Sequence, residues 1–134
     1  MANEATLKLK ISDPIDFTVA DGTGIEKGTI CKITDPRTAS ASSADGESFA
    51  GVAAREKIAN DGRTRLALHI EGIFDMTTVS SPAAITAGDP VKIAGANLID
   101  AADDDTVEGM AEVIGYALET VAATVQETIE VRLK

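Results

Sequence analysis

The sequence predicts an all-β protein, a small β-barrel or β-sandwich with at most one or two short helices. Apolar and polar residues alternate with a period of two in many short segments, which is typical of half-buried strands. The turns between these segments are rich in Gly, Asp, Asn and Pro. The same order of turns and strands also occurs twice along the chain. Short, closely spaced strands of this kind favour a barrel or sandwich over an open sheet.

The strand candidates follow one another along the chain. The first contains Leu7, Leu9 and Ile11, which alternate with polar side chains. The segment around residues 65–73 has the clearest alternation, and Gly72 at its end predicts a bulge or bend. The remaining predicted strands lie in residues 15–19, 29–34, 49–58, 65–79, 90–93, 110–121 and 127–133.

Four other segments, two of which overlap, differ from this pattern. Residues 81–86 and 104–110 are the places where a short helix fits best. Residues 35–48 contain no large apolar residue before Phe49 and predict a mobile surface loop. Residues 100–108 form an acidic loop that contains Asp103, Asp104 and Asp105. A calcium site is conceivable there, but the spacing does not fit the twelve-residue calcium loop, so a solvated turn is favoured.

The internal repeat relates residues 24–70 to residues 84–133. Ile25, Gly28 and Ile33 recur 60 residues later as Ile85, Gly88 and Ile93. In the same way Gly51 and Ala53 recur as Gly115 and Ala117, and Leu66, Leu68 and Ile70 recur as Ile129, Val131 and Leu133. We therefore expect residues 1–23 to form an N-terminal arm with the first strands, and residues 24–134 to form a single β domain built from the two similar halves.

Composition restricts the partners and the chemistry. A chain of 134 residues suits one domain, and its 44% hydrophobic content is that of a folded protein. The net charge of −10 disfavours nucleic acid and anionic membranes. Cys31 is the only cysteine, so an internal disulfide is impossible. The beginning of the chain lacks the apolar run of a signal peptide, which predicts that the protein stays where it is made.

No catalytic or cofactor site is predicted. His69 is the only histidine and lies within a strongly alternating strand, where an outward-facing structural role is favoured over a catalytic one. The glycines of residues 20–24 lack the Lys-Ser/Thr ending of a phosphate-binding loop. Clustered metal ligands and basic stripes with aromatic residues are also missing from the sequence. We therefore expect neither an enzyme, nor a cofactor, nor a metal.

A resemblance to a known family is carried by residues 85–91 (ITAGDPV), by the preceding Glu71-Gly72-Ile73-Phe74 and by residues 114–119 (IGYALE). Together with residues 128–133 (TIEVRL), these segments resemble the small capsid-decoration, or cement, proteins of tailed phages. The resemblance implies a β-barrel or β-sandwich that binds the outer surface of the assembled major capsid protein shell and stabilises it. It also implies a homo-oligomer, with a trimer favoured, that is made in the host cytoplasm and located in the virion.

The N-terminal arm is the predicted contact surface. Leu7, Lys8, Leu9, Lys10 and Ile11 combine apolar side chains with a local positive charge in an acidic protein, and their strand could add to a neighbouring sheet. An ordinary first strand of the protein's own sheet is the alternative. Two other functions remain open: a phage tail or baseplate accessory or carbohydrate-binding β module, and an enzyme that holds a metal at residues 103–105.

Overall fold

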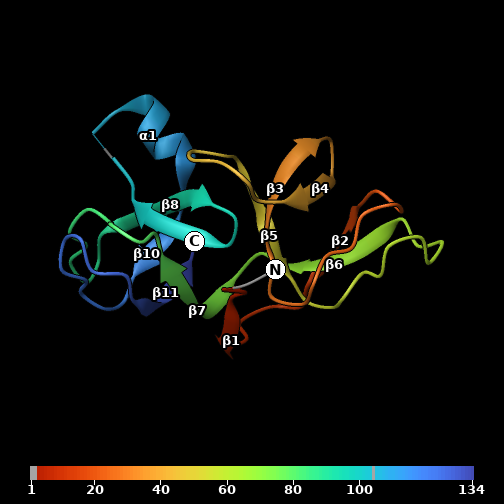
Figure 1. The fold of residues 1–134 in the computed structure, drawn as a ribbon, viewed down its shortest axis with the longest axis horizontal. Helices are drawn as coiled ribbons and strands as arrows, with labels where there is room; N and C mark the ends of the chain where they lie inside the picture. Colours follow the sequence, from red (N-terminus) through yellow and green to blue (C-terminus); the bar gives the residue numbers. More distant parts are fainter. Residues whose placement is uncertain (1–2, 104) are drawn as a thin grey trace.

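The computed structural model describes residues 3–103 and 105–134 and consists of two small barrels that are packed against each other (Figure 1). The first barrel closes in the order β2-β4-β3-β5-β6. Its strands are β2 (Ile15–Thr18), β3 (Ile30–Asp35), β4 (Thr38–Ala41), β5 (Phe49–Ala53) and β6 (Arg65–His69).

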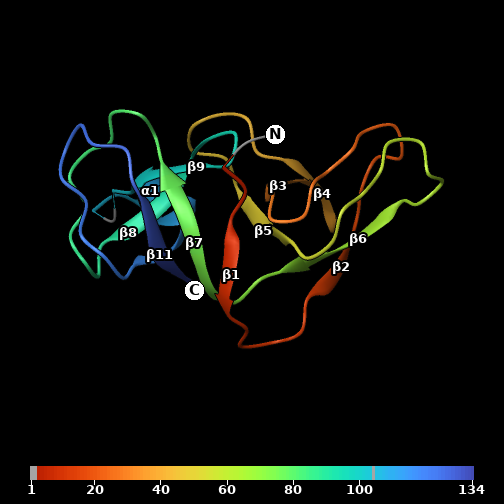
Figure 2. The same cartoon turned by 60° about the horizontal axis from the view of Figure 1, so that its bottom comes forward.

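The second barrel has the corresponding order β7-β11-β10-β8-β9, closed by a β7–β9 pairing. Its strands are β7 (Gly72–Thr78), β8 (Pro90–Gly95), β9 (Leu98–Ala101), β10 (Val113–Ala117) and β11 (Thr128–Leu133). Strand β1 (Thr6–Leu9) extends this sheet beside β7, as Figure 2 shows, and α1 (Val107–Glu112) precedes β10. The all-β prediction, with a barrel and one short helix, is confirmed.

The two barrels have matching backbones. In each, the first strand pairs in parallel with the third and antiparallel with the fifth. Equivalent turns adopt the same left-handed conformation, as in Gly28 and Gly88, with φ of 88° and 99°. Asn60 and Thr124, with φ of 60° and 67°, are another such pair. The predicted domain boundaries at residues 23 and 24 stay a prediction.

Each barrel is filled by small aliphatic side chains, because the chain contains no Trp and only three Phe. Cys31, Ala39, Ala50 and Ala53 occupy much of the first core, whereas the second core is rich in isoleucine. Barrel closure also brings some strands very close together. A Cβ on Gly115 would lie 2.2 Å from the Arg132 carbonyl oxygen, and one on Gly51 would lie 2.7 Å from that of His69. Glycine is therefore required at both equivalent positions.

A joint of apolar and polar contacts connects the barrels. Ile30 and Val52 belong to the first barrel, yet they are fully buried in the hydrophobic cluster of the second. The Ile30 N–H donates to Asn97 Oδ1 at 2.9 Å, and the Asn97 N–H donates to Ser42 Oγ at 3.1 Å. The Gly46 N–H donates to the Ile93 carbonyl at 2.9 Å. Residues of the first barrel therefore extend the core of the second barrel, while the first barrel keeps a separate core of its own.

Several sequence-based expectations were wrong in detail. Residues 35–48 are not a mobile loop: they include β4 and a segment that is hydrogen-bonded to the second barrel. Small residues hid this strand, since Ala39 fills a core position that usually takes a larger side chain. Its counterpart β9 was also missed, and residues 81–86 are not helical. The other expected helix begins later, at Val107, where Thr106 Oγ1 accepts from the Gly109 N–H.

Candidate functional site

Of the predicted contact residues, Leu7, Lys8 and Leu9 lie on β1 at the edge of the second barrel (Figure 2), and Lys10 and Ile11 follow the end of this strand. β1 pairs with β7 of its own chain, which is the ordinary first-strand arrangement, and its other edge is unpaired in the described sheet. Leu7, Leu9 and Ile11 are 38%, 55% and 55% exposed. These three side chains give residues 4–11 an accessible apolar surface. This part of the predicted N-terminal arm is called the arm from here on.

The two lysines of the arm do not form a free positive patch. Lys8 Nζ lies 3.6 Å from Asp75 Oδ2, and Lys10 Nζ lies 2.7 Å from Asp13 Oδ1. The hydrogen bond from Lys10 lowers the pKa of Asp13. The strand is also irregular at Lys8, because Leu7 pairs with Phe74 while Leu9 pairs with Ile73. Bulges and lysines of this kind protect an edge strand from indiscriminate pairing, so side-chain contact suits this surface better than strand addition.

A groove of about 630 Å³ lies between the arm and the joint of the barrels. Its walls include Leu7 of the arm, Lys27 and Val52 of the first barrel, and Phe74 of the second. His69 also lines it. The sequence predicts a histidine on the outer face of its strand, but that face is covered here, and the residue is only 9% exposed. The imidazole packs against Phe74 with ring centroids 5.6 Å apart, and its Nδ1 has no hydrogen-bond partner among the described residues.

The electrostatic surroundings of His69 favour the neutral ring. Burial, and then the charges of Lys10 and Lys27, lower its pKa. A neutral, buried imidazole against an aromatic ring behaves as a packing residue. The other titratable core group, Cys31, is also inert, because burial raises the pKa of its thiol to about 12.

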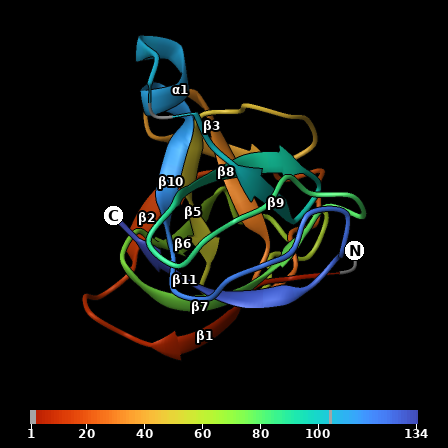
Figure 3. The ribbon, with the colours of Figure 1, turned by 90° about the vertical axis from the view of Figure 1, so that its left-hand side faces the viewer.

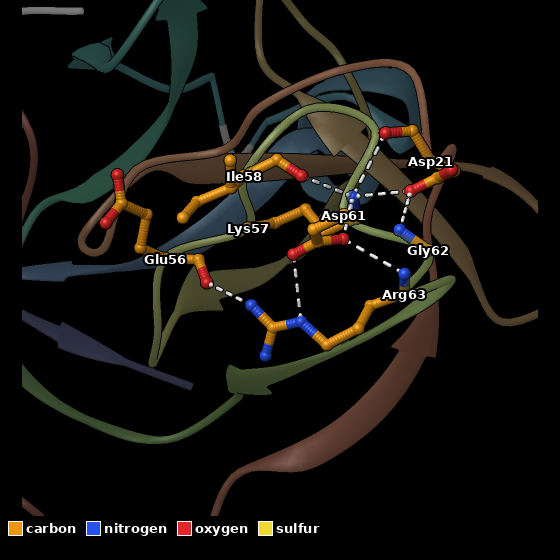
Figure 4. A network of polar contacts seen from close by, with 7 residues as sticks. All are labelled: Asp21, Glu56, Lys57, Ile58, Asp61, Gly62 and Arg63. Carbon is orange, nitrogen blue, oxygen red and sulfur yellow. Dashed lines mark hydrogen bonds and ion pairs between the residues drawn. The ribbon is translucent and has the colours of Figure 1, made fainter.

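A buried lysine organises the outer end of the first barrel (Figure 4). The Lys57 side chain is fully buried, and its Nζ donates to Asp61 Oδ1 and to the Ile58 carbonyl at 2.7 Å each, and to Asp21 Oδ1 at 3.1 Å. Burial acts to lower the pKa of Lys57, but these hydrogen bonds outweigh it and raise the pKa. The hydrogen bond from Lys57 Nζ, followed by the one from the Arg63 N–H, lowers the pKa of Asp61.

This ammonium group holds together two loops, residues 20–24 and 58–63, and no sequence motif revealed it. In the second barrel Val121 takes the equivalent position, since the Ile25–Lys57 bridge matches the Ile85–Val121 bridge. The barrel fold itself therefore does not need the lysine. Its added effect is to fix the loops at one end of the molecule.

The predicted acidic loop contains a local hydrogen bond between two of its residues. Asp104 lies outside the described residues, and Asp103 Oδ1 accepts from the Asp105 N–H as part of a turn. Within residues 3–103 and 105–134, no group of three or more His, Cys, Asp or Glu side chains is placed to hold a metal ion. The one helix in those ranges is too short and polar to cross a membrane. The lack of a metal or cofactor site stays a prediction.

The fold and these surfaces define a small all-β protein of two packed barrels with exposed apolar side chains. A model of a family described as phage cement protein matches residues 10–133 of the 134-residue chain. The chain therefore belongs to the phage cement protein family. A search of curated proteins found no match.

Family membership confirms the resemblance that residues 71–74, 85–91 and 114–119 indicated. It gives the protein a capsid-stabilising role and a place in the capsid of a phage virion. This is a structural role.

Proposed function

We propose that the protein binds the outer surface of the assembled major capsid protein shell through its N-terminal arm and clamps neighbouring capsid subunits together. The exposed apolar row formed by Leu7, Leu9 and Ile11 supports this contact, since exposed apolar side chains on an ordered strand gain free energy when a partner covers them. The arm also lies across the joint of the two barrels, as the Ala5 N–H donates to the Gly28 carbonyl at 2.7 Å.

The rigid double barrel suits a clamp. A cement protein transmits load between subunits, and two barrels joined by buried apolar side chains and hydrogen bonds deform less than two domains on a flexible linker. The proposal includes assembly as a homo-oligomer, with a trimer favoured, synthesis in the host cytoplasm, and action without catalysis, nucleic acid or membrane. The free, buried Cys31 is compatible with a reducing compartment.

Capsids stripped of accessory proteins provide the test. Electron microscopy of capsids incubated with the purified protein should show regular extra density at symmetry-related positions, with hundreds of copies per particle. Bare shells, or a few copies at one vertex, would contradict the proposal and favour the tail-accessory or carbohydrate-binding alternative. The paired variant Leu9→Asp with Ile11→Asp should lose most of the occupancy.

A matched control separates arm contact from a general surface effect. Val125 and Leu118 are 45% and 40% exposed and lie outside the arm, so Val125→Asp with Leu118→Asp introduces the same two charges elsewhere. This control should bind capsids as the wild type does. If the arm variant binds equally well while remaining folded by circular dichroism, the arm is not the capsid contact.

A further inference from the structure

The joint between the barrels uses two different faces. The face that the first barrel contributes consists of Ile30, Phe49 and Val52, which pack on the hydrophobic cluster of the second barrel; we call it the packing face. The face that the second barrel contributes includes Phe74, Ile93 and Asn97; we call it the receiving face. An interface between two unlike faces of similar units can in principle be repeated head to tail.

The internal repeat places a counterpart of the packing face on the second barrel. The 60-residue offset relates Ile30 to Pro90, and the 64-residue offset relates Val52 to Tyr116 and Phe49 to Val113. Pro90, Val113 and Tyr116 indeed line one groove of about 350 Å³, together with Met110 and Lys134. Figure 3, which views the molecule from the side of the second barrel, shows β10 continuing from α1 near the surface.

A counterpart of the receiving face lies on the first barrel. Ile33 and Arg37 are the counterparts of Ile93 and Asn97, each 60 residues earlier. Ile15 is the counterpart of Phe74, because they pair with the equivalent residues Leu68 and Val131. The chain thus has two packing faces and two receiving faces, and the joint between its own barrels contains one of each.

Both unused faces leave apolar side chains in solvent. On the receiving side Ile15 and Ile33 are 36% and 41% exposed, whereas Phe74 and Ile93 are 1% and 0% exposed. On the packing side Met110 is 53% exposed and Tyr116 is half-buried, whereas Val52 is fully buried. Ile15, Ile33 and Tyr116 therefore lack the cover that their counterparts Phe74, Ile93 and Val52 receive, whereas Val113 is only 6% exposed.

The glycine turns beside the packing faces show the same difference. A Cβ on Gly28 would lie 2.4 Å from the Ala5 carbonyl oxygen, because the arm crosses this turn. Gly88 has the same left-handed conformation, yet among the described residues nothing lies within 4 Å of its Cβ position. The covered turn and the open turn differ in what packs on them, not in their backbone.

The chemistry of the open packing face suits a reversible contact. Pro90 has no N–H, so the counterpart of the buried Ile30 donor needs no acceptor when this face is exposed. Tyr116, with Arg132 stacked 5.3 Å from its ring centroid, and Met110 are residue types enriched in protein interfaces.

We infer that the open packing face of the second barrel binds the open receiving face of the first barrel in a second copy of this chain. The contact is head to tail, and each copy uses both faces, so copies form a ring if the rotation between them closes. Capsids take no part in this contact. Self-association can therefore fail while capsid binding succeeds, and the reverse also holds.

Analytical ultracentrifugation of the purified full chain tests the inference. The wild type should show a concentration-dependent mass above the 13.8 kDa of one chain. Met110→Asp on one face and Ile33→Asp on the other should each weaken self-association by at least about tenfold, since each buries a charge in an apolar contact. Ile58→Asp, at a residue that is 59% exposed and outside both faces, should associate as the wild type does.

Mixing the two variants distinguishes this contact from a two-fold symmetric dimer. Met110→Asp keeps an intact receiving face and Ile33→Asp keeps an intact packing face, so an equimolar mixture should form a species of two chains and nothing larger. A wild type that is monomeric at all concentrations would overturn the inference, and so would a mixture that stays monomeric while both variants are folded by circular dichroism. Loss of capsid binding in Met110→Asp with a monomeric wild type would assign the face to the capsid instead.

Discussion

Replacing Asn97 by Ala should weaken the joint between the barrels more than any change at its surface. Asn97 is fully buried, has φ of 58°, and its Oδ1 accepts the Ile30 N–H at 2.9 Å. Alanine leaves that donor without a partner, which costs about 1–3 kcal/mol. Alanine also tolerates the left-handed conformation less well than asparagine, by about 1–2 kcal/mol. The expected loss is therefore about 2–5 kcal/mol of unfolding free energy.

Urea denaturation followed by circular dichroism measures this loss, which should appear as a midpoint lower by on the order of 1–2 M. Asn60→Ala is the matched control, because Asn60 has φ of 60° but an exposed side chain. It loses only the conformational part, about 1–2 kcal/mol. If both variants lose the same free energy, the buried hydrogen bond contributes nothing to the joint and the reasoning is refuted.

Three other results are expected. Burial acts to raise the pKa of Glu47, but hydrogen bonds from Lys32 and from the N–H groups of Ser43 and Ala44 lower the pKa to about 2. The contribution of Glu47 to stability is therefore complete above the ordinary pKa of 4.5 and is lost as the pH falls toward 2. Melting temperatures between pH 7 and pH 2 should therefore fall less in Glu47→Gln, which starts lower, than in the wild type, and a parallel decline in both would contradict this assignment. Cys31 should not react with a thiol reagent at pH 8 until urea unfolds the protein, and rapid labelling of the native protein would show that the first core opens. Gly115→Ala should fail to fold or melt far below the wild type. Gly88→Ala has open space but φ of 99°, so it should lose only about 1–2 kcal/mol; similar melting temperatures would show that the strands can separate at Gly115.

The sequence determined the class of fold because alternation survives wherever one side of a strand is buried. The offsets of the repeat were correct to the residue: Gly51 and Gly115 meet equivalent carbonyls, and Gly28 and Gly88 share a left-handed turn. The arm residues Leu7, Leu9 and Ile11 were also exposed as a contact surface requires. Their role in capsid binding stays a proposal.

Strand β4 could not be found from the sequence, since Ala, Ser and Thr do not produce a clear hydrophobic alternation. Strand β9 is Leu-Ile-Asp-Ala, and four residues with two adjacent apolar side chains show no alternation either. The burial of Lys57 was also hidden, because a lysine is normally exposed and its four oxygen partners come from two separate loops. The burial of His69 was hidden as well, because the groups that cover it come from outside its own strand. It is not part of its own barrel's hydrophobic cluster, and it lies against Phe74 of the second barrel in a groove that the arm also lines.

By itself, then, the amino-acid sequence determined what each half of this protein is: short alternating strands, turns with required glycines, and cores of small aliphatic residues. Only the tertiary structure decided which outer faces are covered. Local periodicity records whether a side chain faces its own barrel. Ile30 and Pro90, like Ile93 and Ile33, occupy equivalent places in the repeat, yet only Ile30 and Ile93 are covered by the neighbouring barrel. That difference depends on how two closed units pack, which no pattern within one unit encodes.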